Sequence, residues 1–162
     1  MKKIISLKTL VMTLKPLRKK SKKIVFTNGC FDIIHAGHVR YLKKAKSLGD
    51  ILVVGLNSDS SVVSIKGPTR PIVPQNERAE VLSALSSVDY VVIFNEQTPI
   101  KLIEAIRPDI LAKGADWAAK EIAGAGVIKK NGGRIRRITL VKGRSTTNII
   151  KRILELHRGE DG

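Results

Sequence analysis

The sequence predicts an α/β protein built on a single doubly wound parallel sheet, with an additional helix at the N-terminus. Short apolar, β-branched runs alternate along the chain with longer segments in which apolar residues recur at helical spacing. The short runs show little alternation of apolar and polar residues, as is typical of parallel strands covered on both faces. The 162 residues contain no internal repeat or low-complexity tract, so we expect one domain with a substantial core.

The N-terminal helix is expected over residues 4–19, where apolar residues lie at helical spacing and Ser6 is a candidate N-cap. Pro16 is expected to end or kink this helix. The basic cluster that follows, up to Lys23, is interpreted either as a soluble connector or as an arm that contacts anions. The predicted organisation is an N-terminal helix and basic connector (1–22), the α/β domain (23–158) and a tail (159–162).

The stretch around which the chain is organised is TNGCFDIIHAGH, residues 27–38. It follows a predicted strand at 24–27 and leads into a predicted helix at 39–48. α/β proteins hold phosphates at such junctions, because free N–H groups and the positive end of the helix dipole point at the anion. His35 and His38 straddle the helix start and can donate hydrogen bonds to phosphate oxygens.

Strands and helices continue to alternate after this helix. Asp59, which follows a predicted strand at 51–56, is expected either to contact a substrate hydroxyl or to cap the next helix. The Gly- and Pro-containing loop at 65–71 carries two cations and could close over phosphates. Thr98 is expected to cap a helix that has Pro99 at its first position. The other strands are expected at 89–94, 108–112 and 134–138, and the other helices at 76–85, 118–131 and 148 to about 157.

A second candidate phosphate site is GRSTT, residues 143–147, which opens the last predicted helix. It offers hydroxyl groups, free backbone N–H groups and a guanidinium. Because both helix starts follow strands of a parallel sheet, we expect them at the same edge of that sheet. Neither start is a P-loop or a G-x-G-x-x-G dinucleotide motif.

The chain is strongly basic, with 30 Lys and Arg against 14 Asp and Glu and a net charge of +16. This balance favours a polyanionic partner, which is nucleic acid, an anionic membrane or a small phosphorylated substrate. Three Phe, two Tyr and one Trp are too few for a platform that stacks single-stranded bases. The single cysteine, Cys30, excludes an internal disulfide and fits a reducing cytoplasm. No apolar run approaches the roughly 18 residues of a membrane span, and no signal peptide is expected.

Residues 28–38, NGCFDIIHAGH, resemble the G-x-F-D-x-x-H-x-G-H signature of the cytidylyltransferase-like nucleotidyltransferases, which have a Rossmann-like fold. GRSTT resembles the second, Ser/Thr-rich signature of that superfamily. With Lys66-Gly67-Pro68 and Lys113-Gly114, the chain looks most similar to the bacterial sugar-phosphate adenylyltransferases of ADP-heptose synthesis. The resemblance covers about residues 24–154 and implies a free-standing enzyme, because the kinase half of the bifunctional form is absent from this chain.

The resemblance implies that AMP passes from ATP to D-glycero-β-D-manno-heptose 1-phosphate, giving ADP-heptose and pyrophosphate. The sugar phosphate would attack the α-phosphorus in line, so neither a protein nucleophile nor a strong general base is required. Mg²⁺ is expected as a counter-charge on the triphosphate, held mostly by phosphate and water, with no protein metal ligands. A cytoplasmic homodimer is expected, with no membrane or nucleic-acid partner.

The resemblance also implies roles for individual residues. His35 and His38 contact the triphosphate, His38 at the α-phosphate, and Lys66 bridges the phosphates of nucleotide and substrate. Asp32 is interpreted either as a substrate-binding residue or as one that fixes the turn by accepting backbone N–H groups. Arg78 either reaches the substrate phosphate or belongs to an ion pair on a helix surface. The nucleotide-binding set comprises Cys30, Phe31, His35, His38, Asp116, Arg144, Ser145, Thr146 and Thr147, and the substrate-binding set comprises Asp32, Lys66 and Arg78.

Two alternative functions stay open at this point. The first is a CTP-dependent cytidylyltransferase for glycerol- or ethanolamine-phosphate, since the two activities share the same signatures. An apolar residue near Leu140 and Arg144 within GRSTT favour the adenylyl branch over it. The second is a basic nucleic-acid-binding module on the same fold without catalysis. The spread of basic residues along the chain disfavours this module.

Overall fold

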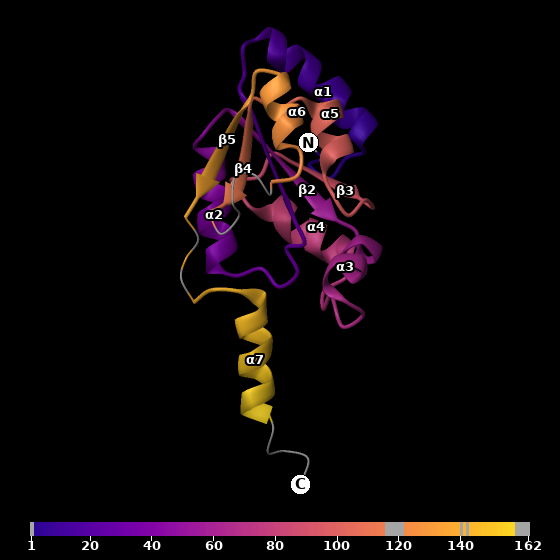
Figure 1. Cartoon of the computed structure of the whole chain (residues 1–162), viewed down its shortest axis with the longest axis vertical. Coiled ribbons are helices and arrows are strands. Elements are labelled where there is room, and N and C mark those ends of the chain that lie inside the picture. The colour runs from indigo at the N-terminus through magenta and orange to yellow at the C-terminus, as the bar shows by residue number, and fades with distance from the viewer. Residues whose placement is uncertain (1, 116–121, 140, 142, 158–162) are drawn as a thin grey trace.

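In the computed structural model, five parallel strands form one sheet in the order β3-β2-β1-β4-β5 (Figure 1). The structure describes residues 2–115, 122–139, 141 and 143–157. The observed architecture confirms the predicted α/β fold and its N-terminal helix. The strands are β1 (Ile24–Gly29), β2 (Ile51–Asn57), β3 (Tyr90–Phe94), β4 (Ile110–Gly114) and β5 (Arg134–Ile138).

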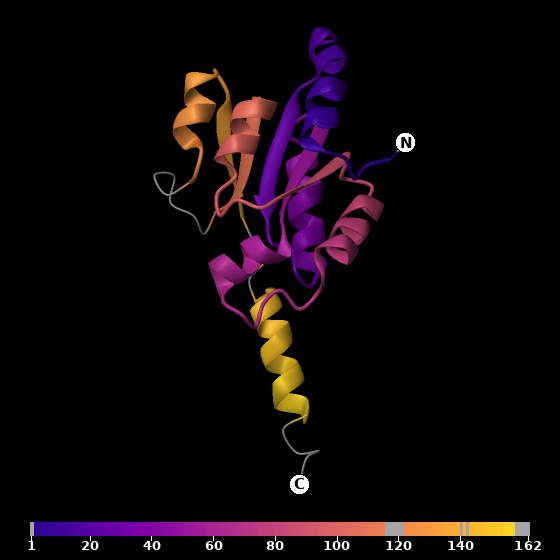
Figure 2. The ribbon, with the colours of Figure 1, turned by 90° about the vertical axis from the view of Figure 1, so that its right-hand side faces the viewer.

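Helices cover both faces of the sheet, as a doubly wound arrangement requires (Figure 2). One face carries α1 (Leu7–Lys19), α5 (Ile100–Ile106) and α6 (Ala125–Lys130). The opposite face carries α2 (Ala36–Lys46) and α4 (Gln75–Ala84). Two helices remain. α3 (Asp59–Lys66) directly follows β2, and α7 (Thr146–His157) extends away from the body of the molecule (Figures 1 and 2).

The core forms because successive strand residues point to opposite faces of the sheet. In β1, Ile24 and Phe26 pack into the cluster under α1 and α5, whereas Val25 packs into the cluster under α2 and α4. All three side chains are completely buried. β1 lies between β2 and β4, so the chain order reverses at β1 and a crevice opens there at the carboxyl ends of the strands.

Carboxylates hold the opposite, amino-terminal edge of the sheet. Asp109 accepts the N–H of Ile24 at 2.7 Å, and Asp89 accepts the N–H of Leu52 at 2.6 Å. Asp50 does the same for Lys23 at 2.8 Å. These bonds satisfy backbone donors where the strands begin, so three acidic residues are committed far from the crevice.

The observed elements differ from expectation at several boundaries. Pro16 lies inside α1, which continues to Lys19, so the expectation that it ends the helix is wrong. The N-cap of α5 is Pro99 rather than Thr98, and α3 is capped by Ser58 rather than by Asp59. Both differences are one-residue shifts of the helix start. Ser6 caps α1 as predicted. Of the helix expected at 118–131, residues 118–121 lie outside the described part, and residues 122–124 are not helical, because Gly124 has a left-handed backbone with φ of 86° and α6 begins only at Ala125.

No helix within the described residues is both long and apolar enough to cross a membrane. The basic cluster after α1 is partly used in packing. Arg18 donates to the carbonyl of Arg107 at 2.7 Å, and Lys22 pairs with Asp50 at 3.1 Å. These contacts fit the interpretation of this cluster as a connector better than that of an anion-contacting arm.

Gly55 provides the sharpest test of the core packing. A Cβ atom there would lie 2.9 Å from Cζ of Phe26 and 3.1 Å from Cδ1 of Leu102, both in the core. We expect Gly55→Ala to lower the free energy of unfolding by about 1–3 kcal/mol, because a close-packed core cannot admit another methyl group without strain. Urea denaturation followed by circular dichroism measures this change.

The matched control is Gly126→Ala in α6, where an added Cβ meets no atom within 4 Å. This variant should keep or slightly raise the stability, since alanine favours helix by up to about 1 kcal/mol over glycine. Equal destabilisation by the two substitutions would contradict the packing argument.

Candidate active site

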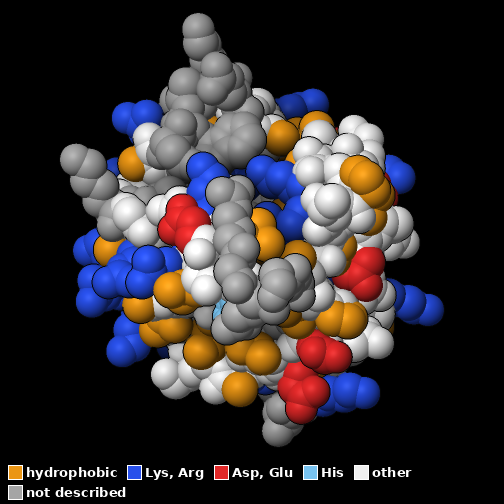
Figure 3. All heavy atoms as spheres, turned by 90° about the horizontal axis from the view of Figure 1, so that it is seen from below, with side chains coloured by type: hydrophobic (Ala, Val, Ile, Leu, Met, Phe, Trp, Pro, Cys, Tyr) orange, Lys and Arg blue, Asp and Glu red, His pale blue; other side chains and the backbone are white. Residues whose placement is uncertain are grey.

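A cavity of about 680 Å³ opens at the carboxyl edge of the sheet, in the crevice beside β1. Its walls come from the β1–α2 junction, the ends of β2, α3 and β4, the segment before α5, and the start of α7. Figure 3 looks onto this end from below and shows Lys and Arg side chains near its centre, together with a His side chain. The cavity lies within the 300–1,000 Å³ range that is usual for small-molecule sites.

The two candidate phosphate motifs meet in this cavity, although more than a hundred residues separate them. Thr146 Oγ1 donates to the carbonyl of Ile33 at 3.4 Å. A Cβ atom on Gly37 would lie 2.8 Å from Cε1 of His35 and 3.2 Å from Cβ of Arg144, so a larger residue there would displace both side chains. His35 and His38 on one side, and Arg144 with Ser145, Thr146 and Thr147 on the other, all line the cavity.

The two histidines stack on each other at the start of α2, with ring centroids 3.9 Å apart and an angle of 24° between the planes. His35 is the N-cap of α2, and its Nδ1 accepts the N–H of Gly37 at 3.1 Å. Because Nδ1 is the acceptor, the proton of the neutral His35 ring lies on Nε2, which can donate to a ligand. His38 has a buried Nδ1 without a hydrogen-bond partner among the described residues, and a buried polar atom of this kind points to a ligand.

Both histidines are held neutral in the free protein. Burial and then the neighbouring His35 lower the pKa of His38 to about 4, against the opposing effect of a backbone hydrogen bond with Ile33. The pKa of His35 is also lowered, first by burial and then by the charge of Arg144. A bound polyanion would favour the charged form of each ring, so it would raise both pKa values.

Asp32 clamps the loop that follows α3 onto the β1–α2 junction. Its carboxylate accepts the N–H of Ile72 at 2.8 Å and that of Val73 at 2.9 Å, and it forms an ion pair with Arg70. Burial acts to raise the pKa of Asp32, but these backbone bonds and the charge of Arg70 outweigh it and lower the pKa. Asp32 therefore accepts backbone N–H groups, as one of the two interpretations expects, but from a distant loop rather than from its own turn.

Arg78 is buried behind Cys30 and Asn57, which line the cavity, rather than lying on a helix surface. Its side chain is 0% exposed, and its guanidinium donates to the carbonyls of Val73 at 2.8 Å and Asn57 at 2.9 Å. It also donates to the carbonyl of Cys30 and pairs with Asp59 at 2.7 Å. Four of the five N–H donors of the guanidinium are thus engaged by protein oxygens, and its complete burial separates it from the position of the expected contact with a substrate phosphate.

The cavity has a strong excess of positive charge. Lys66, Arg70, Lys113 and Arg144 line it, and Asp32 is the one carboxylate among the described lining residues. Lys113 donates to the side chain of Asn28. Such a surplus of cations in a partly enclosed site attracts polyanions.

Sequence reasoning placed Lys113 at the carboxyl end of a strand but assigned it no role, and it did not single out Asn28 or Asn57. The positions of Lys113 and Asn57 at the carboxyl ends of strands were the available signal. Cys30 and Phe31, which the sequence assigns to nucleotide binding, line the cavity. Burial raises the pKa of the Cys30 thiol, which disfavours a reactive thiolate. Asp116, expected in the nucleotide site, lies outside the described residues.

Phe31 has a left-handed backbone, with φ of 43°, a conformation that is uncommon for bulky residues. Its ring lies 5.3 Å from the ring of His38, at 60°. The turn thus directs the Phe31 ring against that of His38. Within the described ranges, no group of three or more His, Cys, Asp or Glu side chains could hold a metal ion.

Comparison with known proteins gives a consistent picture. A family model described as Cytidylyltransferase-like matches residues 26–152. The bifunctional protein HldE of Syntrophotalea carbinolica is 56% identical over 138 residues, and that of Campylobacter concisus is 60% identical over 136 residues. These matches cover 85% and 84% of this chain but 28% of each relative. The chain therefore spans little more than a quarter of the length of these relatives.

Solved structures give the same fold. A lipopolysaccharide core biosynthesis protein from Thermoplasma volcanium matches with a TM-score of 0.60 and 32% identity, covering 76% of this chain and 99% of that one. A pantoate-beta-alanine ligase from Francisella tularensis matches with a TM-score of 0.57 at 17% identity, covering 98% of this chain and 80% of that one. The second likeness concerns the fold alone.

The Asp32 clamp predicts a specific dependence of stability on pH. Asp32→Asn should lower the free energy of unfolding at pH 7 by about 1–3 kcal/mol, because it weakens buried, charge-assisted hydrogen bonds. Since folding lowers the pKa of Asp32, its stabilisation is complete above the ordinary value of about 3.9 and is lost as the pH falls through the lowered value.

Urea unfolding of both proteins between pH 3 and pH 7 measures this effect, with the exposed Glu104→Gln as control. The gap between wild type and Asp32→Asn should shrink toward pH 3, while Glu104→Gln stays within about 0.5 kcal/mol of wild type. A gap of constant size over the whole range would refute the ionic clamp.

Proposed function

The chain belongs to the cytidylyltransferase-like family, and we propose that it transfers AMP from ATP to D-glycero-β-D-manno-heptose 1-phosphate, giving ADP-heptose and pyrophosphate. The relatives named bifunctional protein HldE and the solved lipopolysaccharide core biosynthesis protein support this substrate class. The likeness of the motifs to those of sugar-phosphate adenylyltransferases supports the choice of ATP over CTP.

One observation carries the proposal. Two helix starts of phosphate-binding type, distant in the sequence, line a single cavity with surplus positive charge. A triphosphate needs donors at both ends if its α-phosphorus is to be held in line for attack. The histidine pair at α2 and the hydroxyl groups at the start of α7 supply those two ends.

The proposed reaction needs positioning and charge stabilisation rather than covalent catalysis. The anionic oxygen of the sugar phosphate attacks the α-phosphorus, the bond to the β-phosphate oxygen breaks, and pyrophosphate leaves. His38 and the Nε2–H of His35 donate to the triphosphate, and Lys66 bridges the two substrates. Arg144 with Ser145, Thr146 and Thr147 holds the β- and γ-phosphates, where charge develops on the leaving group.

Asp32 and Arg78 act in this proposal as positioning residues rather than as substrate contacts. Their hydrogen bonds hold Cys30 and the loop at 70–73 against the β1–α2 junction. Asp59 supports Arg78 in the same way. The sequence predicts a helix cap or a substrate contact for Asp59, and it does not predict the ion pair with Arg78.

Magnesium enters the proposal with the nucleotide. Asp32, the carboxylate that lines the described cavity, is already engaged by Arg70 and two backbone N–H groups. The ion would therefore be held by phosphate oxygens and water, and it would supply charge neutralisation on the triphosphate. The proposal includes a cytoplasmic homodimer, which fits the free thiol of Cys30 and the exposed apolar side chains of α7.

Pyrophosphate release separates the proposed reaction from its nearest alternative. The enzyme is incubated with ATP or CTP and with heptose 1-phosphate, glycerol 3-phosphate or ethanolamine phosphate. We expect turnover with ATP and heptose 1-phosphate that exceeds every other pair by at least about tenfold in kcat/KM, which corresponds to about 1.4 kcal/mol. A preference for CTP would make the chain a cytidylyltransferase.

His38→Ala tests the assignment of the histidine pair. Loss of one donor to the transferring group should lower kcat roughly 100- to 1000-fold, with a much smaller change in the melting temperature. His157→Ala, at the far end of α7, is the matched control and should keep kcat within twofold. Turnover by His38→Ala within tenfold of wild type would remove this residue from the mechanism.

A further inference from the structure

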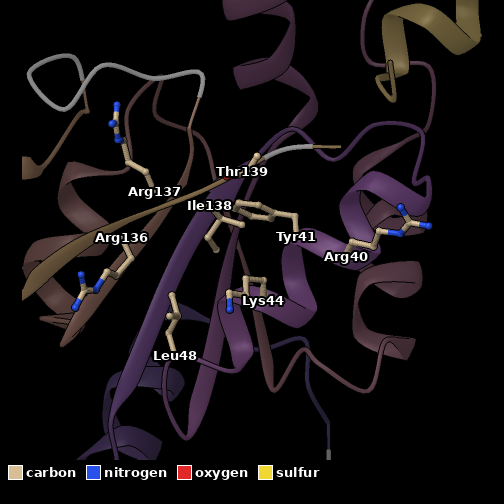
Figure 4. Close-up of a pocket in the computed structure, with 8 residues that line it drawn as sticks. All are labelled: Arg40, Tyr41, Lys44, Leu48, Arg136, Arg137, Ile138 and Thr139. Carbon is tan, nitrogen blue, oxygen red and sulfur yellow. The ribbon is translucent and has the colours of Figure 1, made fainter. Parts of the chain in front are cut away.

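A second cavity, of about 320 Å³, lies between α2 and β5 and is separate from the candidate active site. Figure 4 shows Tyr41, Leu48 and Ile138 between the helix and the strand, with Lys44 beside them and the guanidinium groups of Arg40 and Arg136 farther out. The cavity thus combines an apolar floor with a cationic rim. Its volume falls at the lower end of the usual range for small-molecule sites.

Four cations line this cavity, and they are Arg40, Lys44, Arg136 and Arg137. None of the ion pairs between described residues includes Arg40, Lys44 or Arg136. All three side chains are exposed. Arg136 lies on the same face of β5 as Ile138, two residues along, and Ile138 belongs to the cluster that packs under α2. The strand therefore places Arg136 on the face that α2 covers, with its guanidinium extending outward from the cavity (Figure 4).

Two explanations account for such an arrangement. β5 is an edge strand, and charged side chains on an edge prevent pairing with other chains. That explanation needs charges along the strand, but it does not need a cavity or cations on the facing helix. Like charges gathered around a hollow repel one another, and a bound anion would relieve the repulsion. A discrete hollow also fits a small ligand better than it fits a nucleic-acid strand, which needs an extended track.

The position of this cavity links it to the candidate active site. Tyr41 lines both cavities, and its hydroxyl forms a 2.8 Å hydrogen bond with Thr27 in β1. The helix wall, α2, begins with the histidine pair, and β5 leads into the segment that carries Arg144. A ligand that joins α2 to β5 would therefore connect the helix that begins at the histidine pair with the strand that precedes the segment of Arg144.

We propose that the cavity between α2 and β5 is a second binding site, for a small molecule that carries at least two phosphate charges. The guanidinium groups and Lys44 would bind the phosphoryl oxygens, and Tyr41, Leu48 and Ile138 would accommodate less polar atoms of the ligand. This site is independent of the reaction proposed for the larger cavity.

Nuclear magnetic resonance of the ¹⁵N-labelled protein, at 17.8 kDa, tests the site with pyrophosphate as the probe. The larger cavity is first saturated with α,β-methylene-ATP, and pyrophosphate is then added. We expect the amide signals of Arg136, Ile138 and Lys44 to shift together with one saturable binding curve. Shifts confined to residues of the larger cavity, such as His38, would overturn the proposal, and this map does not depend on which reaction the enzyme catalyses.

The variant pair sharpens the test. Lys44→Ala/Arg136→Ala should weaken this binding at least tenfold, whereas Lys43→Ala/Arg134→Ala should change it less than twofold. The control pair removes the same charge from the same two elements, at exposed residues that do not line the cavity. Equal weakening by both pairs would show a general charge effect and overturn the site. Binding of a short RNA that depends on Lys44 and Arg136, without binding of pyrophosphate, would overturn it in favour of a nucleic-acid surface.

Discussion

The burial of one guanidinium, that of Arg78, organises the wall of the candidate active site. A charge in a protein interior costs several kcal/mol unless hydrogen bonds compensate it. Here the carbonyls of Cys30, Asn57 and Val73 and the carboxylate of Asp59 all accept from it. Those four acceptors come from the ends of β1 and β2, the start of α3 and the loop before α4. Compensation of a single charge therefore holds four segments in place.

Asp32 completes this network from the other side. Its carboxylate accepts the N–H of Val73, and Arg78 donates to the carbonyl of the same residue. The two buried charges therefore fix both backbone groups of Val73. The acidic residues of the sheet are committed elsewhere, since Asp50, Asp89 and Asp109 accept strand N–H groups at the amino-terminal edge. The carboxyl edge keeps more cations than acids, and the neutral histidines add N–H donors to this positively charged surface.

The sequence was sufficient for the features that depend on local pattern. Apolar runs predicted the five strands, and the turn and hydroxyl motifs predicted the two helix starts that meet at one edge. It was insufficient for Arg78, because an arginine in a helix looks alike whether it faces solvent or is buried against carbonyls from distant segments. Pro16 misled for a related reason, since tertiary packing of Leu10 and Leu14 sustains α1 to Lys19.

The predicted start of a helix was wrong where two neighbouring residues could both serve as its N-cap. Ser58 and Asp59 are both good N-caps, and Asp59 is instead drawn into the pair with Arg78, which leaves Ser58 to accept the N–H of Ser61. The same long-range contact therefore determines the helix start and the wall of the cavity. Single-sequence reasoning cannot rank such candidates, because the deciding partner lies nearly twenty residues away.

The last helix shows how the site depends on surroundings beyond the sheet. α7 contributes Thr146 and Thr147 to the cavity, yet no residue of this helix is buried, and Ile153, Leu154 and Leu156 are each at least half exposed. An isolated helix of about 12 residues is marginal in water. Only residues of its first turn line the cavity, so the described part of the chain stabilises the remaining turns little. A second copy of the chain that covers these apolar side chains would order the hydroxyl motif as well, which would make nucleotide affinity a function of assembly.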